Sequence, residues 1–212
     1  MNNPAPELIY IHDPMCSWCW GFDKTRKALF DGLRDQLQIR RLLGGLAPDS
    51  DQPMPADMQR YLQATWHKIE QRIPGTEFNF NFWKLCKPRR STWPSCRAVI
   101  AARVQGAEYD LLMTKAIQEA YYLHARNPSD IPVLLDIAKE IGLDANAFEK
   151  ALLSEKTQQQ LLAEVKEARE LGVEGFPSLV FSQGKRRWRI PIDYTESSPM
   201  ADLIIDLLED GS

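Results

Sequence analysis

Apolar residues near the N-terminus come in short runs that indicate strands, separated by a stretch with helical spacing. The run Leu8–Ile11 predicts a buried strand over residues 7–12, which ends at Asp13 and Pro14. Residues 16–36 predict a helix, and residues 38–43 predict a second strand. Because the connections are short, this strand–helix–strand unit favours parallel pairing of its strands with a right-handed crossover.

The middle of the chain, from residue 53 to about residue 157, is almost entirely helical in its pattern. Its first helix shows apolar residues close to the 3.6-residue period, at Met58, Leu62, Trp66 and Ile69. The predicted helices cover residues 55–73, 92–104, 108–123, 130–141 and 144–153, and residues 74–90 predict a loop rich in aromatic side chains. These helices are too many to lie flat on a small sheet, so we expect a separate lobe.

Mixed structure returns in the last quarter of the chain. The pattern predicts a helix over residues 157–171, strands over 178–181 and 186–192 joined by a turn at 182–184, and a helix over 198–208. Neither end of the chain has enough strands for a sheet of its own, so both ends are expected to build one sheet. The predicted division is a discontinuous domain of residues 1–46 and 156–212, with an inserted helical domain of residues 47–155.

Composition narrows the range of functions. The 212 residues carry 26 Lys and Arg against 29 Asp and Glu, a formal charge of −3, which argues against binding nucleic acid through a basic face. No stretch approaches the roughly 20 apolar residues of a membrane span, so no membrane partner is expected. Residues 1–7 lack the positive charge of a signal peptide. These features predict a cytoplasmic protein, in which a cysteine pair more often serves catalysis or metal binding than structure.

The strongest local motif is Cys16-Ser17-Trp18-Cys19, which lies where the first strand ends and the next helix begins. Free N–H groups and the helix dipole at such a position stabilise an anion, so Cys16 is expected to be a thiolate nucleophile. Cys19 lies nearly one helical turn further on and is expected to be more buried. It would resolve a mixed disulfide formed on Cys16. The two thiols themselves hold the electrons, so no bound cofactor and no metal are expected.

A second motif, Gly175-Phe176-Pro177-Ser178, directly precedes the third predicted strand. Locally, an ordinary trans proline at the start of a strand remains an open alternative, since only about 5–6% of X–Pro bonds are cis. The order of elements, however, places this segment opposite the cysteines.

Three segments together resemble the DsbA family of thioredoxin-fold proteins, and in particular its cytoplasmic branch that includes FrnE-type predicted disulfide isomerases. The segments are Asp13–Phe22, Ser91–Ala98 and Gly172–Ser178. The resemblance implies an α/β thioredoxin-like fold with a large inserted helical domain. It also implies a thiol–disulfide oxidoreductase or isomerase whose partner is glutathione or another small-molecule or protein thiol.

The resemblance also assigns roles to individual residues. It implies that Pro177 is cis and packs against Cys16, and that the backbone of Phe176 pairs with an extended substrate. Ser17 and Trp18, between the cysteines, are expected to contact substrate as well. This dipeptide differs from the Pro-His of the periplasmic oxidase DsbA, so the strong oxidising power of that enzyme is not carried over.

Two other classes of function stay open. Kappa-type glutathione transferases and 2-hydroxychromene-2-carboxylate isomerases resemble the same fold. Their glutathione chemistry needs no resolving cysteine, so the presence of Cys19 favours a thiol–disulfide oxidoreductase. A non-catalytic peptide-binding module is the second alternative. In that case the cysteine pair is incidental or half of a zinc site completed by Cys86, Cys96 or a histidine.

Several residues have both a functional and a structural interpretation. His12 could stabilise the thiolate or move a proton, although a hydrogen-bonded structural histidine is more common at such a position. Cys86 and Cys96 are expected to be free thiols, with Cys96 on the buried face of its helix, and a second redox pair is the alternative. Asp13 is expected to be a turn residue.

Two basic runs and one aromatic segment complete the picture. Residues 185–189 are expected to be a solvated edge strand, with a contact to glutathione or an acidic peptide as the alternative. The same two interpretations apply to residues 87–90. The aromatic segment over residues 78–83 is either a lid or packed against the helical lobe.

Overall fold

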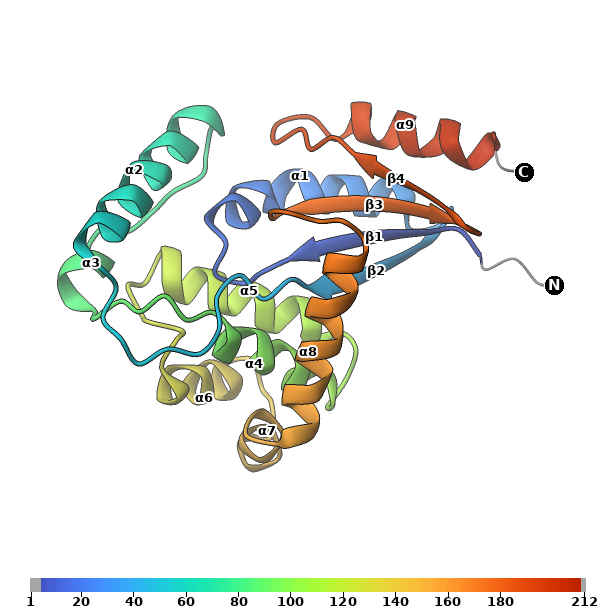
Figure 1. Ribbon diagram of the computed structural model, residues 1–212. Coiled ribbons are helices and arrows are strands. Elements are labelled where there is room, and N and C mark those ends of the chain that lie inside the picture. The colour runs from blue at the N-terminus through green and yellow to red at the C-terminus, as the bar shows by residue number, and fades with distance from the viewer. Residues whose placement is uncertain (1–4, 211–212) are drawn as a thin grey trace.

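A four-stranded mixed sheet lies at the centre of the computed structural model, which describes residues 5–210 (Figure 1). Its strands run in the order β2-β1-β3-β4. Their bounds are Glu7–His12 for β1, Gln38–Leu43 for β2, Ser178–Gln183 for β3 and Arg186–Ile190 for β4. β1 pairs with β2 in parallel and with β3 in antiparallel fashion. The predictions of a parallel first pair and of one sheet built from both ends of the chain are confirmed.

The helices follow the predicted order. Their bounds are Ser17–Leu33 (α1), Ala56–Arg72 (α2), Phe82–Leu85 (α3), Trp93–Arg103 (α4), Tyr109–Tyr122 (α5), Ile131–Glu140 (α6), Ala145–Leu152 (α7), Glu155–Glu170 (α8) and Ser198–Glu209 (α9). The predicted ends agree within a few residues. The segment predicted as a loop over residues 74–90 is not wholly irregular, because it contains the short helix α3. None of the helices in residues 5–210 is long and apolar enough to cross a membrane.

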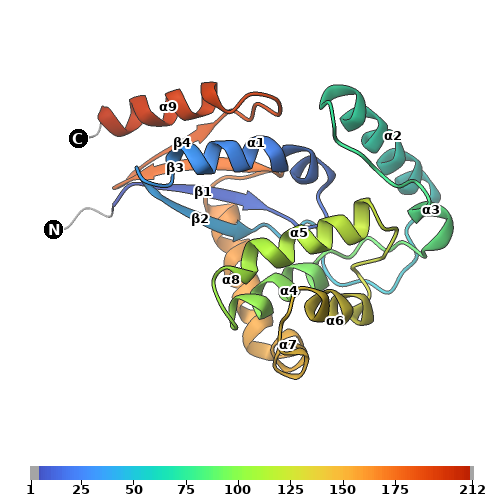
Figure 2. The same cartoon turned by 180° about the vertical axis from the view of Figure 1, so that it is seen from behind.

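Both faces of the sheet are covered by helices (Figures 1 and 2). Leu8 and Tyr10 pack into the cluster that contains residues of α1 and α9. Ile9 and Ile11 point the other way and pack against α8. Successive side chains of a strand alternate between faces. A strand buried on both sides therefore reads as the continuous apolar run seen at Leu8–Ile11 rather than as an alternating pattern.

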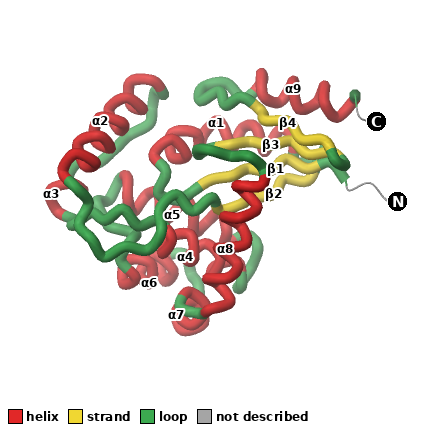
Figure 3. Tube along the Cα trace, in the orientation of Figure 1, coloured by secondary structure: helices red, strands yellow, loops and turns green. Residues whose placement is uncertain are grey.

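The helices α2 to α7 lie between β2 and α8 along the chain and form a lobe beside the sheet (Figure 3). The core of this lobe surrounds α4, whose residues Cys96 and Ala98–Ala102 are all buried. A helix that is apolar on all sides needs neighbours on all sides. The domain division near residues 46 and 155 stays a prediction, and its outer limits at residues 1 and 212 lie outside the described residues.

A buried ionic network joins the lobe to the sheet. Asp110 of α5 pairs with Arg41 of β2 at 2.5 Å and also with Arg103 of α4. Arg103 in turn pairs with Glu164 of α8 at 2.5 Å, and Glu164 accepts the backbone N–H of Leu43 at 2.8 Å. Burial alone would raise the pKa of Asp110, but the guanidinium groups of Arg103 and Arg41 outweigh it and lower that pKa. Removing one member would leave a buried charge without its partner.

An aromatic cluster centred on Trp66 holds α2 to the rest of the molecule. The Trp66 ring is fully buried. Its neighbours, with ring centroids 4.9–6.1 Å away, are Phe78, Phe80, Phe82, Trp83, Tyr121 and Tyr122. Of the two interpretations of the aromatic segment, packing against the lobe is therefore the one that the structure shows.

We expect Trp66→Ala to lower the free energy of unfolding by about 3–5 kcal/mol, because it leaves a large cavity among well-packed rings. Leu85→Ala is the control, since Leu85 is 74% exposed and lies in the same region. That variant should stay within about 0.5 kcal/mol of the parent chain. Urea unfolding monitored by circular dichroism measures both. Equal effects of the two substitutions would show that the cluster does not hold the lobe together.

Candidate functional site

Cys16 is the N-cap residue of α1, directly after the turn that follows β1. The backbone N–H of Cys19 points at the Cys16 Sγ over 3.4 Å. The thiol of Cys16 also lies 3.3 Å from the carbonyl oxygen of Phe176, to which it donates. The predicted position of Cys16 at a helix start is confirmed. A free N–H aimed at the sulfur is the local geometry that favours a negative charge there.

Cys19 lies deeper than Cys16, with 1% of its surface exposed against 6%. Burial is the main reason that the pKa of Cys19 is raised well above its usual value, and the neighbouring Cys16 raises it further. Cys19 is therefore a protonated thiol at neutral pH. The pair thus contains one thiol at the edge of the protein and one inside it.

The segment before β3 lies at the same end of the sheet as the cysteines, because Ser178 at the start of β3 pairs with Ile11 near the end of β1. The peptide bond between Phe176 and Pro177 is cis in the structure. The ring of Phe176 lies directly on the backbone of Gly44, where an added Cβ would come within 2.0 Å of the ring. Glycine at position 44 is thus what allows the ring to lie flat at the end of β2, and the ring in turn fixes the neighbouring carbonyl against Cys16.

The two residues between the cysteines have different surroundings. Ser17 is buried, and its hydroxyl accepts the indole N–H of Trp66 at 3.0 Å, so its side chain is tied to the aromatic cluster. Trp18 is half-buried and leans on Tyr194, with ring centroids 5.1 Å apart. The Arg72 guanidinium lies 5.7 Å from the centre of the Trp18 ring. Of the two, Trp18 has the exposed surface that a substrate contact requires.

A cleft of about 170 Å³ opens beside Cys16. Its walls come from the cysteine motif, α2, the segment before α4, and the loop before β3. The lining residues are Met15, Cys16, Ser17, Trp18, Leu46, Met54, Tyr61, Leu62, Thr65, Arg89, Arg90, Ser91, Thr92, Tyr121 and Phe176. The cleft therefore brings together Cys16, Ser17, Trp18 and Phe176 of the predicted site.

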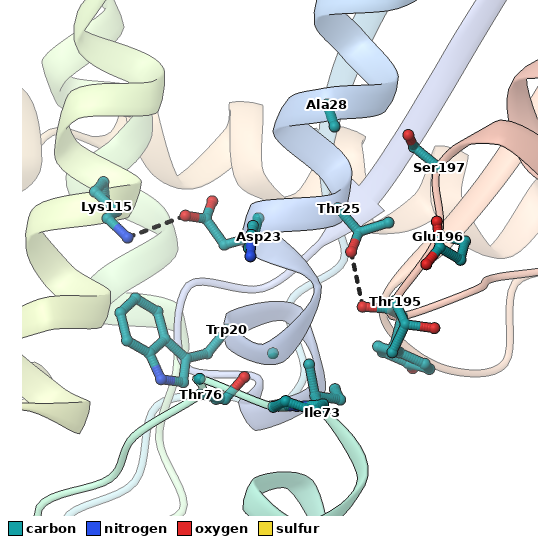
Figure 4. A pocket seen from close by; sticks show the side chains of 15 residues that line it. Trp20, Asp23, Thr25, Ala28, Ile73, Thr76, Lys115, Thr195, Glu196 and Ser197 are labelled. Atoms are coloured by element: carbon teal, nitrogen blue, oxygen red, sulfur yellow. Dashed lines mark hydrogen bonds and ion pairs between the residues drawn. The ribbon is translucent and has the colours of Figure 1, made fainter.

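A larger hollow of about 520 Å³ lies along another side of α1 (Figure 4). Its walls include Trp20, and Asp23 and Lys115, which point toward one another across 3.0 Å. Neither cysteine lines this hollow. Size alone would favour this hollow as the functional site. Cys16, however, lines the smaller cleft, so we assign the site to that cleft.

Asp13 does more than the predicted turn. Its Oδ1 accepts the backbone N–H of Met15 at 2.8 Å, which is the turn contact. Its Oδ2 accepts the N–H of Leu46 at 2.8 Å and the hydroxyl of Thr92 at 2.6 Å, and the Cys96 thiol lies 3.5 Å away. Burial raises the pKa of Asp13, while these hydrogen bonds act in the opposite direction. The contacts to Thr92 and Cys96 span 79 and 83 residues and leave no local pattern in the sequence.

His12 is fully buried, and its ring stacks on Tyr10 with centroids 4.8 Å apart. Neither ring nitrogen has a hydrogen-bond partner within residues 5–210. Burial lowers the pKa of His12 to about 3, against an opposing effect of Asp110. The expectation of a hydrogen-bonded structural histidine is therefore wrong. A neutral ring also supplies no positive charge, so it does not stabilise a thiolate electrostatically.

Cys86 and Cys96 lie in different surroundings. Cys96 is fully buried in the core of the lobe, as predicted, and its thiol faces Asp13. Cys86 is half-buried beside the aromatic cluster and donates to the carbonyl of Ala125 at 3.0 Å. Both are free thiols in the structure, as expected, and the alternative of a second redox pair stays a hypothesis. Across the described residues, no three His, Cys, Asp or Glu side chains gather in a way that could hold a metal ion.

The two basic runs also differ. Residues 185–189 include most of β4, which lies at the edge of the sheet. Arg186, Arg187 and Arg189 are exposed there, as predicted for a solvated edge strand. Residues 87–90, by contrast, reach the cleft beside Cys16, which Arg89 and Arg90 line.

Comparison with known proteins agrees with this geometry. A family model described as Thioredoxin matches residues 9–192. The chain belongs to the thioredoxin family. The expected thioredoxin-like α/β fold and the likeness to DsbA-type proteins are thereby confirmed.

Among solved structures, a candidate protein disulfide isomerase from Nitrosomonas europaea is 26% identical, with a TM-score of 0.85 over 99% of this chain and 100% of that chain. The cytosolic disulfide reductase DsbM from Pseudomonas aeruginosa has a TM-score of 0.76 at 23% identity, over 96% of this chain and 98% of that chain. At that identity, DsbM supports the fold alone.

The curated relatives carry a different description. The ClpXP adapter protein SpxH of Bacillus subtilis (strain 168) is 28% identical over 179 residues, which are 82% of this chain and 58% of the relative. The protein of the same name from Bacillus licheniformis is 32% identical over 191 residues, 85% of this chain and 59% of the relative. The chain thus spans about three fifths of the length of these relatives.

We expect Gly44→Ala to displace the ring of Phe176 and to cost about 1–3 kcal/mol of stability, because the new methyl group has no space. The reaction of Cys16 with a disulfide should slow as well, since the neighbouring carbonyl moves with the ring. Gly175→Ala is the matched control, because a Cβ at Gly175 meets nothing within 4 Å. Thiol titration and urea unfolding of both variants are the measurements. Unchanged kinetics in Gly44→Ala would contradict the assigned role of Gly44.

Acid should destabilise the protein through His12. The pKa of this group falls from 6.5 to about 3 on folding, so between these values the unfolded chain binds the extra proton. The free energy of unfolding therefore decreases as pH falls, by about 2 kcal/mol between pH 7 and pH 5. His12→Phe keeps the stacking on Tyr10 but cannot titrate, so its stability should be flatter over this range. Parallel curves for the two proteins in urea unfolding would refute the assignment.

Proposed function

We propose that the protein is a thiol–disulfide oxidoreductase in which Cys16 is the nucleophile and Cys19 the resolving thiol. The single observation that carries this proposal is the placement of the pair. One sulfur sits at a helix N-cap with a backbone N–H aimed at it and opens into a cleft. The other is buried and protonated directly behind it.

The chemistry follows from that placement. The thiolate of Cys16 attacks one sulfur of a substrate disulfide, forms a mixed disulfide and releases the first substrate thiolate, which takes up a proton. Cys19 then loses its proton and attacks the Cys16 sulfur. This step releases the second substrate thiolate and leaves a disulfide between Cys16 and Cys19. Two electrons pass from the protein to the substrate, and two molecules of an external thiol return them as they join in a disulfide.

The segment before β3 supports substrate binding. The carbonyl of Phe176 lies next to the Cys16 sulfur, at the mouth of the cleft. An extended peptide that carries a disulfide would pair with this backbone as an additional strand. Pro177 is buried beside it and has no N–H that would compete for the substrate carbonyls. Trp18, which also lines the cleft, offers an apolar surface to the substrate.

The setting we propose is the cytoplasm, with glutathione or a protein thiol as the electron donor. The similar protein DsbM is named a cytosolic disulfide reductase and has been solved with GSH. Whether reduction or isomerisation dominates depends on the redox potential of the Cys16–Cys19 pair.

A protein-binding adapter is the second candidate, and the naming of the curated relatives as ClpXP adapters favours it. An adapter needs a surface for its client but no reactive thiol. The two candidates therefore differ in one respect: only the oxidoreductase depends on Cys16.

We expect Cys16→Ser to reduce disulfide reductase activity to the uncatalysed rate, because the hydroxyl is not ionised at neutral pH. Cys86→Ser is the control, since Cys86 is a half-buried thiol outside the cleft, and it should retain full activity. Turnover of a peptide disulfide with glutathione as reductant measures both. Activity that survives the loss of the Cys16 sulfur would exclude the proposed enzyme and leave the adapter.

Cys19→Ala separates redox chemistry from glutathione addition. Without the resolving thiol, the mixed disulfide on Cys16 should accumulate and be visible by mass spectrometry of the intact protein. A glutathione-dependent isomerase would instead keep its turnover in this variant. Full turnover without a trapped mixed disulfide would therefore speak for the kappa-type chemistry.

A further inference from the structure

The cleft beside Cys16 has an uneven charge, although the whole chain carries a formal charge of −3. None of the residues that line it is an aspartate or a glutamate, and its only charged lining residues are Arg89 and Arg90. A nucleophilic sulfur thus opens into a space whose walls carry positive charge and no fixed negative charge.

The two arginines are not equivalent. Arg89 is already neutralised, because its guanidinium lies 2.6 Å from the carboxylate of Asp130 and 2.8 Å from the carbonyl oxygen of Ser129. The half-buried side chain of Arg90 makes no hydrogen bond and no ion pair within residues 5–210. Its charge acts on the hydroxyl of Tyr121, another lining residue, whose pKa it lowers against the larger effect of burial. The cleft therefore contains one uncompensated cation.

We propose that Arg90 is a specificity residue that receives a carboxylate of the substrate disulfide, so that the enzyme favours small anionic disulfides and acidic peptides over neutral or cationic ones. This inference rests on the proposed reaction at Cys16. A guanidinium presents two parallel N–H groups that match a carboxylate. A partly buried position strengthens the pairing relative to one in open solvent.

The size of the cleft sets how much of the ligand it encloses. Sites for whole small molecules usually measure about 300–1,000 Å³, and this cleft measures about 170 Å³. It therefore encloses only the reacting end of a substrate, which for a short thiol acid includes both the sulfur and the carboxylate. The rest of the ligand would extend over the exposed Tyr61 at the rim.

Three symmetric disulfides of similar length test this assignment: 3,3′-dithiodipropionate with two negative charges, bis(2-hydroxyethyl) disulfide with none, and cystamine with two positive charges. The reduced protein is mixed with an excess of each, and the loss of its thiols is followed in time. We expect the second-order rate constant for the dianion to exceed that for the neutral compound by about 5- to 10-fold, with cystamine slowest.

Arg90→Gln should bring the rate with the dianion down to the rate of the same variant with the neutral disulfide, while Arg90→Lys should retain part of the preference as a point charge. Arg187→Gln is the matched control, because Arg187 is an exposed arginine on β4 that does not line the cleft. Raising the salt concentration from about 0.05 M to about 0.5 M should slow the dianion selectively in the unmodified protein. This measurement decides the question even if a variant fails to fold.

Equal rates for the dianion and the neutral compound in the unmodified protein would overturn the assignment, and so would a preference that survives in Arg90→Gln. In either case the proposed reaction stands as long as the neutral disulfide reacts at a rate that depends on Cys16. If the thiols of Cys16→Ser react with the neutral disulfide as fast as those of the unmodified protein, the proposed reaction fails. The role of Arg90 then fails with it.

Discussion

One buried carboxylate holds the parts of the site together. Asp13 has no exposed surface, and donors from three separate parts of the chain converge on it: the turn after β1, the loop after β2 and the start of α4. Burying a carboxylate costs free energy unless its oxygens accept hydrogen bonds, so the fold needs each of these donors at its observed position. The carboxylate consequently fixes the segment that carries Cys16 relative to both the sheet and the lobe.

The geometry of the cysteines depends on this anchor. The carboxylate of Asp13 fixes the turn that leads into α1. Cys16 therefore lies at the helix start, with its sulfur between the N–H of Cys19 and the carbonyl of Phe176. These two contacts have opposite preferences, since the N–H favours the thiolate and the carbonyl favours the thiol. The sulfur thus has one neighbour that suits the thiol and one that suits the thiolate, at the position where it must form and break a bond in each cycle.

The features that could be predicted from the sequence are those with a local signature. Leu8–Ile11 reads as a buried strand, and the Cys16–Cys19 spacing at a strand end reads as a redox pair, because neighbouring residues supply the pattern. The contacts of Asp13 with Thr92, of Ser17 with Trp66 and of Phe176 with Gly44 join distant segments. Each depends on packing that exists only once the lobe and the sheet have met, so no short window of sequence contains it.

His12 and Arg90 illustrate the same limit from the electrostatic side. Both residue types are visible in the sequence, but their charge state and partners depend on burial and on which carboxylates lie nearby. His12 is neutral because its surroundings exclude water, and Arg90 differs from its neighbour Arg89 because Asp130 and the carbonyl of Ser129 bind only Arg89. Sequence adjacency therefore says little about how two identical side chains will behave.

The strand order has a consequence for folding during synthesis on the ribosome. β1 lies between β2 and β3, and β2 follows it after a single helix, whereas β3 is made only after α1 through α8. The edge of β1 that later pairs with β3 therefore stays unpaired for almost the whole time of synthesis. Exposed strand edges invite association with other chains. Early folding of the helical lobe would shorten the effective loop that β3 must close, and would limit the time for which that edge stays open.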